Sequence, residues 1–534
     1  MNTWLLYKDK EWNSYKTYLD SDSIRKDLNL DIIFKTAGRK LRHDTSPLPI
    51  GASDVDYNIF EVMKKVIFVP LETEEEITYR QDILNDFIRC PELLFNLYEV
   101  AQDASLEIIK YRDDMKQRST RGRSNQGSGG ILVSQLNFLK KLSEMLDRLD
   151  QVLTPMEGHM ESKGMREFCR RFKKEYSPQV AVTLKQVMED MEFMTSGGRM
   201  SLVATLGPGL KQTNIIIQNI CKYDYQENRK TAKASGGKLG AIYRNLFVTN
   251  TKIMKEEPLI HDARHLESAV VAALLAYFEE FMRDKTEFFR QLYFQLAFYH
   301  GGVNLYQRLR GFGVGSCMPK VTDRKDMRFT GLVEMSMAIY TRKVPVSNSL
   351  NASDKWLVIV TGANQGGKST YLRSMGLAQI FMQCGLFVTA SSFESGIYRN
   401  IFTHFTRRED STMNSGRLDE EMKRMDEIIR NLTADSLLLL NESFATTTEK
   451  EGSIIAWDIC RALYESKIRV LMVTHLLAFA QKCYHANLEH AVFLSAERTA
   501  TGDRTFQMLE TEPEMTSYGL DLYEEMIEKK RTDF

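Results

Sequence analysis

Residues 357–370 read LVIVTGANQGGKST, and this stretch decides the fold of the second half of the chain. Its first four residues are apolar and predict a buried parallel strand, which ends where a glycine-rich turn begins at Gly362. We expect the turn to open a helix whose first residues are Lys368, Ser369 and Thr370. This order matches the pattern G-x-x-x-x-G-K-S of a phosphate-binding loop, and a strand before and a helix after the motif argue against a chance glycine-rich turn.

The residue types of this loop suit a nucleotide. Glycine has no Cβ, so backbone N–H groups can crowd around an anion, and the helix N-terminus adds partial positive charge. Lys368 can reach the β- and γ-phosphates, and the Ser369 hydroxyl can ligate Mg²⁺. We therefore predict that ATP binds at Gly362, Ala363, Asn364, Gln365, Gly366, Gly367, Lys368, Ser369 and Thr370.

A second apolar run, residues 437–440, ends in Asn441 and Glu442. In P-loop ATPases a strand-end Asp usually helps to hold the metal, and an acidic neighbour can position water. We predict that Glu442 is the general base, and that Asn441 orients a Mg²⁺-bound water through its amide oxygen. Because this amide has no charge, metal affinity or turnover is expected to be lower. On its own, the pair is equally consistent with an ordinary polar strand end.

A third apolar strand, residues 470–474, leads to His475. A histidine just past a core strand can contact the γ-phosphate and respond to its loss, although a lone histidine is more often structural. Between the phosphate loop and the second apolar run lies the polar stretch 409–419, in which Asn414, Ser415 and Gly416 could cap a phosphate bound to another subunit. The alternative is a helix start capped by Ser415, with acidic residues in the first turns, and both can hold together.

Composition limits the classes of protein that fit. The chain has 534 residues, 43% of them hydrophobic, which is enough for several cores. Its 71 basic and 71 acidic residues balance, so any nucleic-acid surface must be a local patch. The seven cysteines never form C-x-x-C and predict reduced thiols in a cytoplasmic protein without a zinc site. No signal peptide or membrane span is expected, because the most apolar helical stretch, 269–277, is short and lies between glutamates.

Upstream of the loop the chain is mostly helical. Apolar residues recur at helical spacing from about residue 74 to 115, from 132 to 149 and from 261 to 310, and a basic helix is predicted at 161–176. Residues 116–130 read as a basic, Gly/Ser-rich surface loop, for which a nucleic-acid contact is the less favoured alternative.

The predicted secondary structure changes from helix to strand at 190–255, where the residues at 200–206, 214–219 and 243–249 predict strands. These strands enclose a basic segment, 222–244. The segment is equally consistent with a nucleic-acid clamp and with a solvated hairpin.

The motifs together resemble the MutS family of DNA mismatch repair ATPases. Residues 358–373, VIVTGANQGGKSTYLR, resemble the family's phosphate loop, and VTHL at 473–476 resembles the segment with its switch histidine. TSYGL at 516–520 resembles its C-terminal Ser-Tyr-Gly motif. SGR at 415–417 resembles the loop that reaches the partner's nucleotide.

The chain departs from this family in three places. The usual Asp-Glu is Asn441-Glu442 here, and SFATTT at 443–448 replaces the Gly-Arg-Gly-Thr-Ser that normally follows. The first 65 residues are too short for the family's mismatch-reading and connector domains. The resemblance therefore implies an ATPase whose sites are completed by a partner subunit and whose long helices act as levers. It does not by itself imply recognition of mispaired bases.

The predicted fold is an α/β P-loop (ABC-type) ATPase domain at 331–534, preceded by a mostly α-helical lever domain at 66–330 with a small β-rich insertion at 190–255, and by an N-terminal segment, 1–65. The resemblance implies a cytoplasmic homodimer that binds ATP, Mg²⁺ and DNA and works with other repair proteins. ATP-driven closure of the dimer is expected to be coupled to DNA binding, in mismatch repair or related DNA transactions. The predicted catalytic residues are Lys368, Glu442 and His475, and the metal ligands are Ser369 and Asn441. The alternatives are a branched-DNA, ribosome-associated or defence-associated ATPase of the same family, and a nucleotide-binding switch with little hydrolysis.

Overall fold

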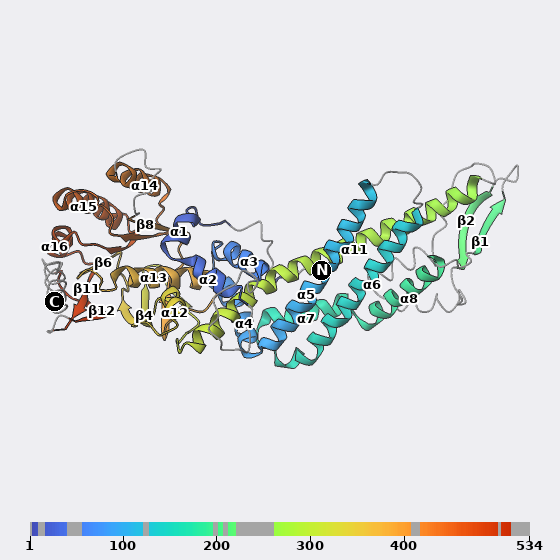
Figure 1. Cartoon of the computed structure of the whole chain (residues 1–534), viewed down its shortest axis with the longest axis horizontal. Helices are drawn as coiled ribbons and strands as arrows, with labels where there is room; N and C mark the ends of the chain where they lie inside the picture. The colour runs from blue at the N-terminus through green and yellow to red at the C-terminus, as the bar shows by residue number, and fades with distance from the viewer. Residues whose placement is uncertain are drawn as a thin grey trace, which may run out of the picture. The chain divides into compact units, whose positions relative to one another are not determined.

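The structure, a computed structural model, describes residues 3–8, 16–39, 56–120, 128–195, 201–206, 212–219, 261–406, 417–499 and 503–513. It divides into two compact units (Figure 1). The helical unit contains residues 1–6 and 89–297, and the sheet unit contains residues 7–88 and 298–534. The sequence analysis instead predicts domain boundaries at residues 65 and 330, and that division stays a prediction.

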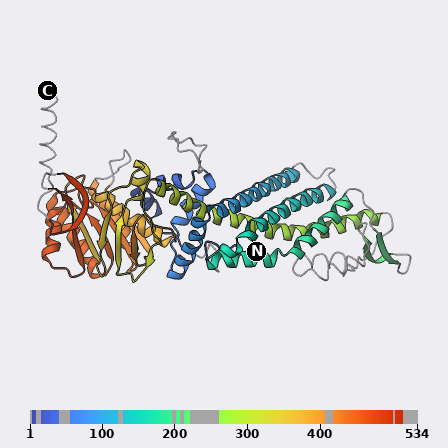
Figure 2. The same ribbon diagram turned by 90° about the horizontal axis from the view of Figure 1, so that it is seen from below.

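The helical unit is built from long helices with apolar stripes. Its elements are α5 (Pro91–Thr120), α6 (Ser128–Leu153), the 3₁₀ helix η3 (Thr154–His159), α7 (Lys163–Glu175), α8 (Pro178–Thr195), β1 (Ser201–Leu206) and β2 (Gln212–Asn219). Helix α11 (His261–Gly311) contributes residues to both units. Helix α6 packs between α5 and α8, and these helices lie alongside one another in both views (Figures 1 and 2).

Aromatic side chains fill part of this unit's core. The ring of Phe288 on α11 stacks on the rings of Phe168 and Phe172 on α7. Near the N-terminus, the backbone N–H of Leu5 donates to the side-chain oxygen of Gln295 at 2.7 Å. In the described part of the chain, no helix has the length and apolar character needed to cross a bilayer.

Two predicted segments of this unit have different boundaries in the structure. The expected loop at 116–130 is shorter, because α5 continues to Thr120 and α6 begins at Ser128. Lys116, Gln117 and Arg118 are good helix formers, and their propensity outweighs the polar composition. The β-rich insertion does not begin at 190, since α8 extends to Thr195. Strands β1 and β2 are confirmed as an antiparallel pair, whereas the predicted third strand and the basic segment 222–244 lie outside the described residues.

The sheet unit contains a six-stranded sheet and a four-stranded sheet. The larger has the order β12-β11-β6-β10-β9-β8, parallel except for β12, and the smaller has the order β3-β7-β4-β5. The strands are β3 (Lys320–Val321), β4 (Met327–Leu332), β5 (Asn348–Asn351), β6 (Leu357–Gly362), β7 (Ser392–Ser395), β8 (Asn400–Phe405), β9 (Ser436–Asn441), β10 (Arg469–Val473), β11 (Ala491–Arg498) and β12 (Arg504–Glu510). The helices are α1 (Ser21–Asp27), α2 (Leu30–Ala37), α3 (Tyr57–Ile67), α4 (Glu74–Arg89), α12 (Met335–Thr341), α13 (Lys368–Gln383), α14 (Arg417–Asn431), α15 (Glu449–Glu465) and α16 (Leu477–His485).

Helices cover both faces of the large sheet. Alternate strand residues such as Ile359, Leu440 and Met472 join one apolar cluster with α14, α15 and α16. On the other face α13 contacts β6, β9 and β10. Burial on both faces explains why these strands read as continuous apolar runs in the sequence.

Residues 7–88 belong to the sheet unit in a way that the sequence does not indicate. The Arg373 side chain on α13 donates to the carbonyl of Asp27 at 2.8 Å, and the Asn304 amide donates to the carbonyl of Ala37 at 2.7 Å. Helices α1 and α2 therefore complete the packing around α13 and α11.

Candidate functional site

The phosphate-loop motif folds as the sequence predicts, with strand β6 ending at Gly362 and helix α13 beginning at Lys368. Gly362 has φ +104°, and a Cβ there would lie 2.7 Å from the backbone N of Ala496 on β11. Gly367, the residue before α13, has φ +88°. Because this residue has no side chain to cap the helix, the first-turn N–H groups keep their capacity to bind an anion.

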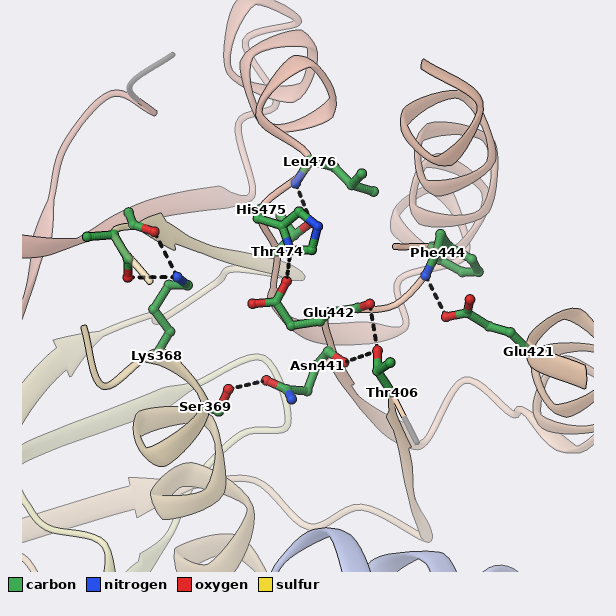
Figure 3. A network of polar contacts seen from close by, with 12 residues as sticks. Lys368, Ser369, Thr406, Glu421, Asn441, Glu442, Phe444, Thr474, His475 and Leu476 are labelled. Carbon is green, nitrogen blue, oxygen red and sulfur yellow. Dashed lines mark hydrogen bonds and ion pairs between the residues drawn. The ribbon is translucent and has the colours of Figure 1, made fainter. Parts of the chain in front are cut away.

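Lys368 is buried and turned back onto the loop. Its ammonium donates to the carbonyls of Gly362 at 2.7 Å and Ala363 at 3.0 Å (Figure 3). Burial lowers the pKa of this lysine, and the nearby Glu442 carboxylate acts in the opposite direction. The only cation of the motif thus lies at the carboxyl end of β6.

The next motif residue joins the second predicted strand. Ser369 donates its hydroxyl to the side-chain oxygen of Asn441 at 2.7 Å (Figure 3). Asn441 is the last residue of β9 and pairs with Val473 of β10, which in turn pairs with Val360 of β6. Because these strands are parallel, their carboxyl ends bring residues from three distant segments to one edge of the sheet.

Glu442 and His475 form a pair at the same edge. The His475 Nδ1 is hydrogen-bonded to the Glu442 carboxylate (Figure 3). This bond is the main reason why the pKa of His475 is raised, and burial opposes it. The interaction therefore stabilises the folded chain below the ordinary histidine pKa, and its contribution is lost as the pH rises through the raised value.

Two residues that the sequence analysis missed hold the backbone around Glu442. The Thr406 hydroxyl, at the end of β8, donates to the carbonyl of Glu442 at 2.8 Å and lies 3.3 Å from that of Asn441. Glu421 on α14 accepts a hydrogen bond from the N–H of Phe444 (Figure 3). An acidic residue is common near the start of a helix such as α14, so the contact of Glu421 with Phe444 cannot be inferred from the local sequence.

A cavity of about 600 Å³ adjoins the phosphate loop. Its polar lining residues include Lys368, Ser369 and Glu442, and its apolar lining residues include Val344, Pro345, Val346, Met337 and Phe506. Arg504 of β12 donates to the Gln365 side chain of the loop at 3.1 Å, so the β11–β12 hairpin lies against this cavity. Phe506 carries no motif that sequence reasoning could have found, whereas residues 344–348 resemble the stretch that precedes the phosphate loop in the MutS family.

The structure thus brings together Lys368, Ser369, Asn441, Glu442 and His475. Asn414, Ser415 and Gly416, which were predicted to complete a partner's site, lie outside the described residues. The TSYGL stretch at 516–520 also lies outside them.

Two family models match the chain. Residues 358–528 match MutS domain V, and residues 72–312 match the MutS2 N-terminal domain. Among curated proteins, the chain is 36% identical over 152 residues to the DNA mismatch repair protein MutS of Chlorobaculum parvum. This match covers 28% of this chain and 17% of that protein.

Similar matches occur in other bacteria. The MutS protein of Chlorobium limicola is 29% identical over 197 residues, covering 36% of this chain and 22% of that protein. The MutS protein of Petrotoga mobilis is 30% identical over 172 residues, covering 32% and 21%. The matched part of the chain spans about a fifth of the length of these curated relatives.

Proposed function

The chain belongs to the MutS family, and we propose that it is a DNA-binding ATPase in which ATP-driven closure of a homodimer is coupled to DNA binding. The observation that carries the ATPase part is the convergence of Lys368, the Ser369–Asn441 contact and the Glu442–His475 pair at one sheet edge. Ligands of open parallel sheets bind at this edge, outside the carboxyl ends of the strands.

The shape of the cavity supports a nucleotide as the ligand. Phosphates would lie against the phosphate loop and Lys368, which supply N–H groups and positive charge. Phosphate oxygens would take the place of the two carbonyls that now accept from Lys368. The apolar lining residues, among them Phe506 and Val344, suit a base.

The donor set at the sheet edge fits Mg²⁺. This ion takes oxygen ligands and usually completes its shell with water and substrate phosphates. Ser369 and Asn441 supply two oxygen atoms 2.7 Å apart, and neither carries a charge. In the described residues, no group of three His, Cys, Asp or Glu side chains could bind a metal, so this neutral pair is the candidate. Bound there, Mg²⁺ would neutralise charge on the phosphates.

Glu442 would position the attacking water and accept its proton. The water oxygen would bond to the γ-phosphorus while the bond from that phosphorus to the β–γ bridging oxygen breaks, which leaves ADP and inorganic phosphate. His475, hydrogen-bonded to the same carboxylate, would orient the Glu442 side chain and respond to the γ-phosphate. Asn414–Gly416 would complete the site of the partner subunit.

Steady-state ATP hydrolysis with and without DNA tests this proposal, on the wild type and on Glu442→Gln. We expect turnover that DNA changes and that falls about 10²- to 10⁴-fold in the variant, while ATP binding persists. DNA affinity should decrease steeply with salt if Lys and Arg contact phosphates. Wild-type turnover that survives in Glu442→Gln would overturn the role of Glu442, and turnover that no DNA changes would overturn the coupling.

Two further functions remain open. Residues 72–312 match the MutS2 N-terminal domain and residues 358–528 match MutS domain V, so a DNA-binding role other than mismatch repair, such as binding branched DNA, is a second candidate. Competition among mismatched, branched and homoduplex DNA separates these jobs. The neutral Asn441 favours a nucleotide-binding switch, which would bind ATP without measurable turnover.

A further inference from the structure

A buried carboxylate lies behind the proposed catalytic residue. Glu421 on α14 is only 6% exposed, and its two oxygens take two different hydrogen bonds. Oε1 accepts from the backbone N–H of Phe444 at 2.6 Å, and Oε2 accepts from the Thr446 hydroxyl. Figure 3 shows the first of these contacts beside Glu442, two residues before Phe444 in the chain.

The segment that Glu421 holds has an unusual backbone. Glu442 has φ +57° and Phe444 has φ +67°, so two residues with side chains occupy the left-handed region within three positions. A residue with a large side chain adopts this conformation only where its surroundings enforce it. Phe444 is fully buried in the apolar cluster under α14, α15 and α16, which fixes its ring but not the direction of its N–H.

Hydrogen bonds at both ends of residues 442–444 fix the backbone direction that the burial of the Phe444 ring leaves undetermined. The Glu442 N–H donates to the carbonyl of Val473 at 2.9 Å, which anchors the start of the turn to β10. The Ser443 hydroxyl lies 2.7 Å from the ring Nδ1 of His404 and 2.9 Å from its carbonyl. Glu421 anchors the end. Without its carboxylate, the Phe444 N–H would be buried without a charged acceptor.

We propose that Glu421 is a positioning residue for Glu442: by accepting the Phe444 N–H and the Thr446 hydroxyl, it holds the left-handed turn that aims the Glu442 carboxylate at the nucleotide. This inference rests on the proposed ATPase function. The carboxylate matters because two donors converge on it and each needs an acceptor. Glutamine offers one oxygen, and its NH₂ would face the second donor.

The test compares Glu421→Gln with Glu420→Gln. The control removes the same charge from the same helix, one residue away, at a partly exposed side chain. A second pair is Thr446→Val against Thr447→Val, where Thr447 bonds Glu451 on α15 instead. For each variant, kcat for ATP is measured beside the dissociation constant for ATP and the urea midpoint.

We expect kcat to fall about ten- to a hundredfold in Glu421→Gln, because a small misplacement of a catalytic group has an effect of this size. ATP affinity should change less than about twofold, since the hydrogen bonds of the Glu421 carboxylate go to Phe444 and Thr446, which are not phosphate-loop residues. Thr446→Val should give a smaller loss of kcat, and both controls should match the wild type. A merely structural role would instead lower the urea midpoint and leave kcat per folded molecule unchanged, which would overturn the proposal.

Hydrogen exchange separates failure of this inference from failure of the proposed function. The Phe444 amide should exchange faster in Glu421→Gln than in Glu420→Gln. If the wild type binds ATP without turnover, the proposed hydrolysis is wrong, and equal exchange rates in these two variants would overturn the anchoring as well. If the wild type turns over and Glu421→Gln keeps its kcat, the positioning role alone is overturned.

Discussion

Replacing Gly362 by alanine tests whether β6 and β11 approach as closely as the structure shows. Gly362 is the last residue of β6 and pairs with Ala496. An added Cβ would lie 2.7 Å from the Ala496 backbone N and 2.8 Å from the Ser495 hydroxyl oxygen. Neither strand can shift independently, because both belong to the middle of the six-stranded sheet.

Two costs add in this variant. A side chain at φ +104° carries a backbone strain of roughly 1–3 kcal/mol. Forcing a methyl group against packed backbone typically costs a further ~1–3 kcal/mol. The expected loss of unfolding free energy is therefore about 2–6 kcal/mol, which is a large part of the roughly 5–15 kcal/mol that domains usually have.

Urea unfolding followed by tryptophan fluorescence measures this loss. Trp356 precedes β6 and Trp457 lies on α15, so both report on the sheet unit. The control is Gly315→Ala, since an added Cβ there meets no atom within 4 Å. ATP affinity should fall about tenfold or more in Gly362→Ala, because the loop must move to relieve the contact.

The control should keep the wild-type urea midpoint and the wild-type ATP affinity. If Gly362→Ala loses less than about 0.5 kcal/mol and binds ATP like the wild type, then the positive φ and the approach to β11 are wrong. The assignment of the phosphate loop would then lack its structural basis.

Three other substitutions probe the same sheet edge. Lys368→Ala should abolish ATP binding or turnover, because it removes the only cation that the loop supplies; unchanged turnover in a coupled-enzyme assay would contradict the assignment. Asn441→Asp should raise turnover or the dependence on Mg²⁺ by adding a charge beside Ser369, and a Mg²⁺ titration that shows lost activity instead would mean that the site needs the amide. Glu442→Gln should be less stable than the wild type near pH 6 by up to about 1 kcal/mol. That difference should shrink towards about pH 9, because the raised pKa of His475 makes the pair stabilising only while the imidazole is protonated; melting temperatures that differ equally at both pH values would contradict this.

Local patterns in the sequence predicted the strands and the phosphate loop. The runs at 357–360, 437–440 and 470–474 are apolar because both faces of the sheet are covered, and the structure confirms all three as parallel strands. The proximity of Ser369 and Asn441 follows from this parallel arrangement, because the carboxyl ends of such strands meet at one edge.

Contacts between distant segments could not be predicted in this way. Glu421 reads as a favourable acidic residue near a helix start, and nothing local reveals that it reaches Phe444. Phe444 carries no signal for a positive φ, because phenylalanine rarely adopts one. The N-terminal helices α1 and α2 have no motif, and their place around α13 depends on contacts such as that of Arg373 with Asp27.

The discontinuous sheet unit also sets the order of events during synthesis. Residues 7–88 leave the ribosome before their partners α13 and β8, which begin about 280 and 310 residues further along the chain. At roughly 5–20 residues per second this wait lasts roughly 15–60 s. During that time Leu28, which is fully buried in the finished chain and lies beside Gly376 of α13, lacks this later surface. We expect the nascent N-terminal segment to depend on chaperones, and the segment 298–534 expressed alone to aggregate unless residues 7–88 are supplied.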